Sequence, residues 1–139
     1  MCDMNDDDLS DQLFDKIRTG SLEEARSALS ELRERFAAGS GVAGHYLSMI
    51  YCPGGIIVES KDVAAFLSQF ESEAECLMLL GQSFPLMLIE ADRGSIRAMN
   101  FLSIHYQTGL PPVERDMEAM RYWDERCSQE AARRKGQKD

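Results

Sequence analysis

Apolar residues recur at helical spacing along the chain, and glycines and polar capping residues separate the apolar stretches. The pattern predicts a first helix over Asp8 to Thr19. A second begins at Ser21, where Glu24 completes a capping box, and runs to about Ala38. A last helix is predicted over Asp116 to Arg134. The chain is therefore expected to be all-α.

Two stretches, Gly39 to Glu59 and Gly94 to Glu114, repeat one another at an offset of 55 residues. Nine of their 21 aligned positions are identical, namely those of Gly39, Ser40, Ala43, Leu47, Ser48, Tyr51, Gly54, Val58 and Glu59 and their counterparts. A repeat of this length predicts a stack of small units that bury their apolar faces against one another.

Each copy opens with a predicted helix whose apolar side chains share one face. These are Ala43, Tyr46, Leu47, Ile50 and Tyr51 in the first copy and Ala98, Phe101, Leu102, His105 and Tyr106 in the second. Gly54 and Gly109 are predicted to end these helices, because glycine accepts the left-handed capping conformation.

A partner helix is predicted after each copy, starting near Ser60 to Asp62 in the first and at Asp116 in the second. The offset of 55 residues exceeds one ordinary helix pair. We therefore expect residues 71–92 to hold a degenerate extra pair, restarted by Ser83 and Pro85. In the last helix, the residues predicted to face inward are Met117, Met120, Trp123, Cys127 and Ala131.

The second copy resembles the Sel-one-like repeat, a relative of the tetratricopeptide repeat, at Ala98, Leu102, Tyr106, Gly109, Val113, Asp116, Met120 and Trp123. Met120 stands where the family prefers Ala, and Ser48 and Ser103 replace the usual Gly. In the first copy, Lys61 falls at the family's Asp position and Ser68 at its Trp position.

The resemblance implies an α/α superhelix of antiparallel helix pairs, about seven helices, in one domain over residues 1–139. The clearest copies cover residues 39–70 and 94–132. Residues 1–8 are expected to be a flexible acidic start, and residues 135–139 a flexible tail.

The charge of the chain narrows the choice of partners. It has 15 basic and 24 acidic residues, a net charge of −9, which disfavours nucleic acid because phosphate is repelled. The apolar runs Cys76 to Leu80 and Leu86 to Ile89 are interrupted by Gly81 and Pro85, so no membrane span is expected. With no secretory signal and four scattered cysteines, a cytoplasmic location is expected.

Residues for catalysis are scarce. The chain has two histidines, His45 and His105, and no metal-ligand spacing, so we expect no enzyme activity, no metal and no cofactor. His105 lies on the apolar stripe and is expected to be structural, whereas His45 lies off it and is expected to contact a partner.

Two surfaces are predicted to bind a protein or peptide. If the resemblance holds, the groove is lined by Val42, His45, Met49, Cys52, Arg97, Asn100, Ile104 and Gln107. An acidic face, suited to a basic partner, is formed by Glu71, Glu73, Glu75, Glu90 and Asp92.

Three functions remain open. The first is a non-catalytic adaptor that holds a protein or peptide in the groove. The second is an immunity or antitoxin-like protein whose acidic face neutralises a basic toxin, and the third is a chaperone for a secreted effector. Homodimerisation through the methionines of the last helix is a further expectation.

Overall fold

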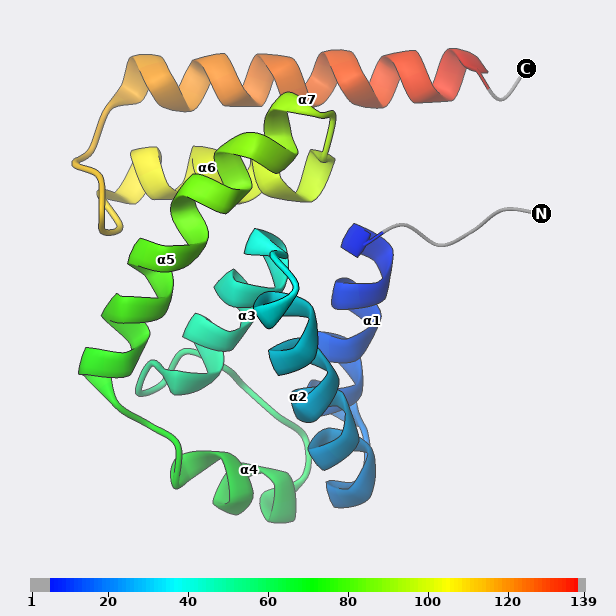
Figure 1. The fold of residues 1–139 in the computed structure, drawn as a ribbon, viewed down its shortest axis with the longest axis vertical. Coiled ribbons are helices and arrows are strands. Elements are labelled where there is room, and N and C mark those ends of the chain that lie inside the picture. The colour runs from blue at the N-terminus through cyan, green and yellow to red at the C-terminus, as the bar shows by residue number, and fades with distance from the viewer. Residues whose placement is uncertain (1–5, 138–139) are drawn as a thin grey trace.

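The computed structural model describes residues 6–137, which form seven α-helices and no strand (Figure 1). The helices are α1 (Asp6–Thr19), α2 (Leu22–Ala37), α3 (Gly41–Tyr51), α4 (Lys61–Ser68), α5 (Glu73–Asp92), α6 (Ile96–Thr108) and α7 (Met117–Gln137). The all-α prediction is therefore confirmed.

The chain ends are more helical than predicted. Residues 1–5 and 138–139 lie outside the described part of the chain, and with them most of the predicted flexible start and the end of the predicted tail. However, α1 already begins at Asp6, and α7 continues through Lys135 to Gln137.

Helices that follow one another in the fold mostly pack side by side in antiparallel orientation (Figure 1). The closest packing joins α1 to α2, α3 to α5 and α6 to α7. In addition, α2 packs on α3 and α5 packs on α6. In Figure 1, α6 and α7 lie across one end of the others, whereas the short α4 lies at the opposite end.

Serine residues begin most of these helices. The hydroxyls of Ser21, Ser40, Ser60, Ser72 and Ser95 each accept a hydrogen bond from the backbone N–H three residues later. At Ser21 the predicted capping box is complete, because the Glu24 carboxylate also accepts the Ser21 N–H at 3.0 Å.

The matching tyrosines of the two repeated helices, α3 and α6, accept equivalent backbone hydrogen bonds. The Ser72 N–H donates to the Tyr51 carbonyl at 2.8 Å, and the Asp116 N–H donates to the Tyr106 carbonyl at 2.8 Å. Ser72 begins α5 and Asp116 directly precedes α7. By this geometry α5, and not the predicted helix at Ser60 to Asp62, is the counterpart of α7.

Helix α4 is therefore an addition to the connection between α3 and α5. The interval from Tyr51 to Ser72 is 11 residues longer than that from Tyr106 to Asp116, and α4 lies within it. This insertion, and not the predicted extra helix pair within residues 71–92, accounts for the long offset between the copies.

That extra pair does not exist, because α5 is one helix of 20 residues with Pro85 inside it. Proline lacks an N–H and crowds the carbonyl four residues before it, which is that of Gly81. Both residues are exposed, and a Cβ placed on Gly81 would meet no atom within 4 Å. The freed carbonyl can therefore bind water, while the other face of α5 holds the helix against α3.

Among the described residues, α5 alone is long and apolar enough to cross a bilayer by length and composition. The prediction that Gly81 and Pro85 break this apolar stretch into separate segments is therefore wrong. A core helix of a soluble protein has the same composition, so this finding by itself is weak evidence of a span.

The predicted helix ends are right for one copy and wrong for the other. Gly109 caps α6 in the left-handed conformation, with φ of 72°. In contrast, α3 ends at Tyr51, and Cys52 is extended, with ψ of 125°. Pro53 explains the early end, because the residue before a proline disfavours the helical conformation.

The apolar stripes of both copies lie in the core. Of the stripe residues, only Tyr51 and Tyr106 are half-buried, and the others are buried. In α7, by contrast, Met117, Met120, Trp123 and Cys127 are half-buried, and Ala131 is exposed although it was predicted to face inward. α7 therefore covers α6 from outside and presents much of its own surface to solvent.

Candidate functional site

The predicted groove is largely filled by the protein itself. Val42 is 0% exposed and His45 is 5% exposed. The His45 ring stacks on Phe101, with 3.9 Å between the ring centroids, and lies 5.3 Å from the ring of His105. The prediction that His45 contacts a partner is wrong, because α6 covers this face of α3.

Burial also sets the ionisation of His45. Desolvation, and then the charge of His105, lower the pKa of His45 to about 3, so the ring is neutral at pH 7. Its Nδ1 has no hydrogen-bond partner among the described residues. His105 is fully buried, as its place on the stripe predicted, and its Nδ1 lies 3.1 Å from the Leu110 carbonyl.

Arg97, another predicted groove residue, is bound by α1. Its guanidinium donates to both carboxylate oxygens of Asp11, at 2.9 to 3.2 Å. The Tyr46 hydroxyl donates to the same carboxylate. Burial, together with this hydrogen bond, raises the pKa of the Tyr46 hydroxyl. One carboxylate of α1 thus joins α3 to α6, which closes the groove at this point.

The remaining groove positions are divided. The Oδ1 of Asn100 accepts a hydrogen bond from the Cys127 thiol at 3.2 Å, so Asn100 faces α7. Ile104 and Gln107 are exposed on α6, and Cys52 is half-buried at the end of α3. Met49 is half-buried and lines a cavity.

The predicted acidic face is not one surface. The Glu90 carboxylate accepts the N–H groups of Gly41 at 2.9 Å and Val42 at 3.2 Å, so it caps the first turn of α3. Asp92 lies 3.7 Å from the Arg126 guanidinium. The other three predicted residues, Glu71, Glu73 and Glu75, are exposed around the start of α5.

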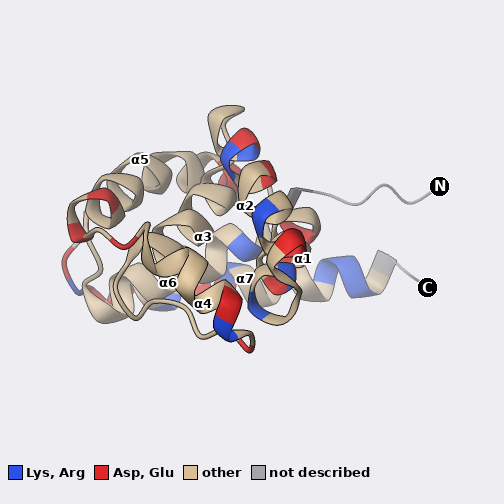
Figure 2. Ribbon diagram, turned by 90° about the horizontal axis from the view of Figure 1, so that it is seen from below, with Lys and Arg blue, Asp and Glu red and all other residues tan. Residues whose placement is uncertain are grey.

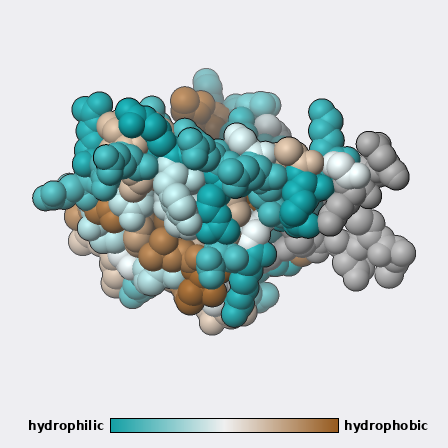
Figure 3. Space-filling model, turned by 90° about the horizontal axis from the view of Figure 1, so that it is seen from above, coloured by the Kyte–Doolittle hydropathy of each residue, from teal (hydrophilic) through white to brown (hydrophobic). Residues whose placement is uncertain are grey.

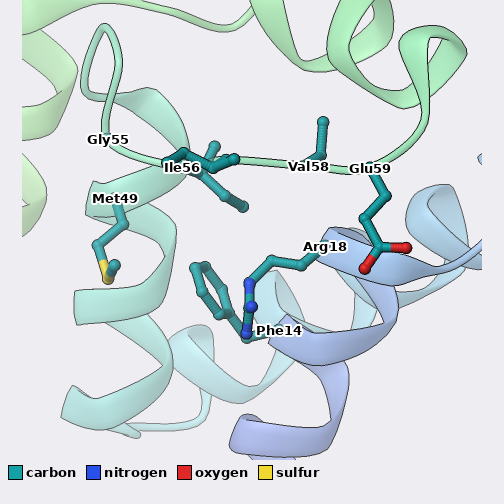
Figure 4. Close-up of a pocket in the computed structure, with 8 residues that line it drawn as sticks. Phe14, Arg18, Met49, Gly55, Ile56, Val58 and Glu59 are labelled. Carbon is teal, nitrogen blue, oxygen red and sulfur yellow. The ribbon is translucent and has the colours of Figure 1, made fainter.

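A cavity of about 480 Å³ lies between α1, the end of α3 and the loop that leads to α4 (Figure 4). Its lining is mostly apolar, with two charged residues, and consists of Phe14, Arg18, Met49, Gly55, Ile56, Ile57, Val58 and Glu59. Figure 4 shows Met49, Ile56 and Phe14 around the hollow, with Arg18 beside Phe14. Of the predicted site residues, only Met49 lies here.

The loop along this cavity is fixed at both ends and open between them. The Gly55 N–H donates to the Cys52 carbonyl at 2.8 Å, and the Glu59 N–H donates to the Arg18 carbonyl at 2.9 Å. Between these anchors, the backbone groups of residues 56–58 form no hydrogen bond within the described part of the protein.

The side chains of the loop are unusually apolar for an exposed segment, and Ile57 is 86% exposed. Ile56 to Val58 are three consecutive β-branched residues, a pattern that favours an extended conformation. No site was predicted from this pattern, because Val58 was assigned to the repeat through its match with Val113. An extended, apolar and unpaired segment beside a cavity is suited to pairing with another extended chain.

Two charged residues, Arg18 and Glu59, line the cavity. Arg18 is paired with Asp15 at 2.9 Å, and Glu59 is exposed. Within residues 6–137, no group of three or more His, Cys, Asp or Glu is placed to hold a metal ion. What the cavity does offer is backbone hydrogen bonds, apolar contact and a carboxylate at its edge.

No family model, no curated protein and no solved structure matches the chain, so no family membership follows from comparison.

Proposed function

We propose that the chain is a non-catalytic protein-binding module that holds an extended segment of a partner along residues 56–58, with an apolar side chain of that segment in the adjacent cavity. The observation that carries the proposal is the unpaired backbone of this loop beside an apolar hollow. β-Strand addition of this kind draws affinity from main-chain hydrogen bonds and specificity from side-chain pockets.

The proposed scaffold is a short α/α superhelix of three antiparallel pairs, α1 with α2, α3 with α5 and α6 with α7, similar to Sel-one-like repeats. Taking α5 as the partner of α3 improves the internal match. Ser72, Cys76 and Leu79 then fall where Asp116, Met120 and Trp123 fall in the second copy. In α2, the same spacing is met by Ser21, Ala25 and Ala28.

The charges around the cavity favour a partner segment with a basic residue. Glu59 is exposed at one edge of the loop, and Asp15 lies beside Arg18. The net charge of −9 attracts such a partner over longer range. The proposed ligand is therefore an extended peptide that combines a large apolar residue with Lys or Arg.

The proposal is tested with peptides selected from a displayed random library against the full chain. A selected peptide is titrated against Met49→Glu, which places a charge in the cavity, and against Gln107→Glu, an exposed groove position on α6. We expect Met49→Glu to weaken binding by about tenfold or more and Gln107→Glu to leave it unchanged. The reverse result would place recognition in the groove.

A second test addresses the backbone. Methylating the peptide amides one at a time removes single donors, and strand pairing makes alternate positions sensitive. Uniform tolerance of methylation would exclude strand addition even if the peptide occupied the cavity.

An acidic inhibitor is the second candidate function, because Glu71, Glu73 and Glu75 are exposed and form no ion pair within the described residues. Such a protein would hold a basic partner chiefly by charge. Replacing all three with Arg would then abolish binding, and raised salt would weaken it steeply. Loss of partner binding with this variant and not with Met49→Glu would favour the inhibitor.

A further inference from the structure

The outward face of α5 is apolar along most of the helix. Leu77, Met78, Leu88 and Ile89 are 45%, 46%, 36% and 50% exposed. No charged residue occurs from Cys76 to Ile89, and Figure 2 shows this length of α5 without the charge colours. A surface helix of a soluble protein normally carries charges on its outer face, so this face is suited to being covered.

The order of residues along this face indicates what covers it. The side chains have the same chemistry when the face is read from either end. Residues equally distant from Ser83 are matched in kind, Leu77 with Ile89 and Met78 with Leu88. Gly81 and Pro85 flank the centre. Self-complementarity of this kind is what a two-fold interface requires, because each copy presents the same patch to the other.

We propose that this face, defined by Leu77, Met78, Gly81, Pro85, Leu88 and Ile89 and hereafter the α5 face, binds the α5 face of a second copy in antiparallel orientation. The apolar pair at the start of one α5 then packs on the apolar pair near the end of the other. Gly81 leaves open space at the centre, so the two helices can approach closely.

A hollow near the end of α5 supports this arrangement. A cavity of about 510 Å³ is lined by Leu88, Ile89, Asp92, Arg93, Tyr122, Trp123 and Arg126. Tyr122 of α7 is 52% exposed at its rim. Figure 3, which views the molecule from the side of α7, shows hydrophobic surface gathered in its lower part. In an antiparallel dimer, the flexible Met78 of the second copy lies opposite this hollow.

The two ends of the α5 face carry exposed charges of opposite sign. Glu73 and Glu75 are exposed at its start, whereas Arg93 is exposed at its end, beside Asp92, which is paired with Arg126. Glu75 and Arg93 are separated by 18 residues, about five turns, so they lie on the same edge of α5. In the antiparallel dimer centred on Ser83, Glu75 is 8 residues and Arg93 is 10 residues from the centre, so each Glu75 lies about 3 Å along the axis from the level of Arg93 of the other copy, within reach of its long side chain.

The test is sedimentation velocity of the full chain over a range of concentrations. We expect a monomer–dimer equilibrium that Met78→Glu and Leu88→Glu each weaken by about 100-fold or more, since each change occurs twice in the interface. Ile104→Glu on α6 is the matched control, because Ile104 is 44% exposed and lies off the α5 face. Circular dichroism melting verifies that each variant is folded.

Exchange of charges tests the orientation. Glu75→Arg and Arg93→Glu should each weaken the dimer alone, and mixing the two variants should restore it, because every facing pair is then of opposite sign. A chain that stays monomeric up to about 1 mM, or a dimer that Ile104→Glu disrupts as strongly as Met78→Glu, would overturn the proposal. The proposal would also be overturned if the α5 face bound phosphatidylcholine vesicles in place of a second copy, or if mixing Glu75→Arg with Arg93→Glu did not restore the dimer.

Discussion

The connections that follow the two repeated helices differ although their sequences share Tyr, Gly, Val and Glu at matching places. After α6 the loop closes on itself: the Leu110 N–H donates to the His105 carbonyl at 2.9 Å and the Val113 N–H donates to the Leu110 carbonyl at 3.3 Å. After α3 the inserted α4 carries the chain away, and residues 56–58 remain unpaired within the described protein.

This difference accompanies the candidate site beside the first copy. In the second copy, the N–H groups of Leu110 and Val113 donate within the connection, which leads directly into α7. In the first, the added length separates the loop from its helix and leaves a cavity of about 480 Å³ against α1. The insertion after Glu59 therefore distinguishes the two connections, although two repeated residues, Val58 and Glu59, also line the candidate site.

The largest predicted effect concerns what the two copies share. Leu47 and Leu102 are 3% and 0% exposed, so Leu47→Ala and Leu102→Ala should each lower the free energy of unfolding by about 2 to 5 kcal/mol. Chemical denaturation measures both. If one variant lost much less stability than the other, the two copies would not contribute equally to a common core.

The next effect is a pH dependence of stability that arises from the first copy. His45 of the first copy can titrate, whereas Asn100, which matches it in the second copy, cannot. The folded pKa of about 3 lies below the unfolded value of about 6.5, so the unfolded state binds a proton first as the pH falls. Stability is full above about pH 6.5 and falls progressively toward pH 3, by about 2 kcal/mol at pH 5 from this group.

His45→Phe is the matching variant, since it keeps a ring against Phe101 and cannot titrate. We expect its stability to depend less on pH between 7 and 5, as measured by urea unfolding at each pH. His105, whose pKa is also lowered by burial, should leave a smaller residual dependence. Equal slopes for the variant and the natural chain would show that His45 does not stay neutral in the folded state.

A smaller effect is predicted at the helix starts. Glu90 binds the first N–H groups of α3, and Asp7 accepts the Arg97 N–H at 3.4 Å at the start of α6. Glu90→Gln should cost about 1 kcal/mol, because the negative charge at the helix N-terminus is lost while an acceptor remains. Thermal melting detects this loss, and Glu71→Gln on the exposed surface is the control that should change little.

The smallest effect on stability is expected where function is proposed. Ile57 is 86% exposed, so Ile57→Ser should change the free energy of unfolding by less than about 0.5 kcal/mol. The same change should weaken a selected peptide severalfold, because the loop loses apolar contact area. A large loss of stability would instead mean that Ile57 supports the fold.

The sequence predicted what depends on local chemistry. The capping box at Ser21, the cap at Ser60 and the buried stripes of α3 and α6 follow from short-range spacing. It failed at α5, because Pro85 breaks a helix only where its neighbours cannot compensate, and here Gly81 and solvent do.

The candidate site was less predictable because it depends on which helices are neighbours. His45 lies off the apolar stripe of α3, yet α6 buries it. Because other helices pack on α3 from several sides, the spacing of its apolar residues does not predict which of its side chains are exposed. Arg97 could not be assigned to Asp11 without knowing that α1 crosses to α6. Met49 was identified from the groove pattern, but the loop opposite it required the placement of α4.

Hydrogen exchange of individual amides, followed by NMR with and without a selected peptide, tests the central claim most directly. The account predicts rapid exchange at residues 56–58 in the free chain, protection of these amides by the peptide, and protection of Leu110 and Val113 in both states. Protection of residues 56–58 before any peptide is added, or no change on its addition, would contradict the claim that this loop is the binding site.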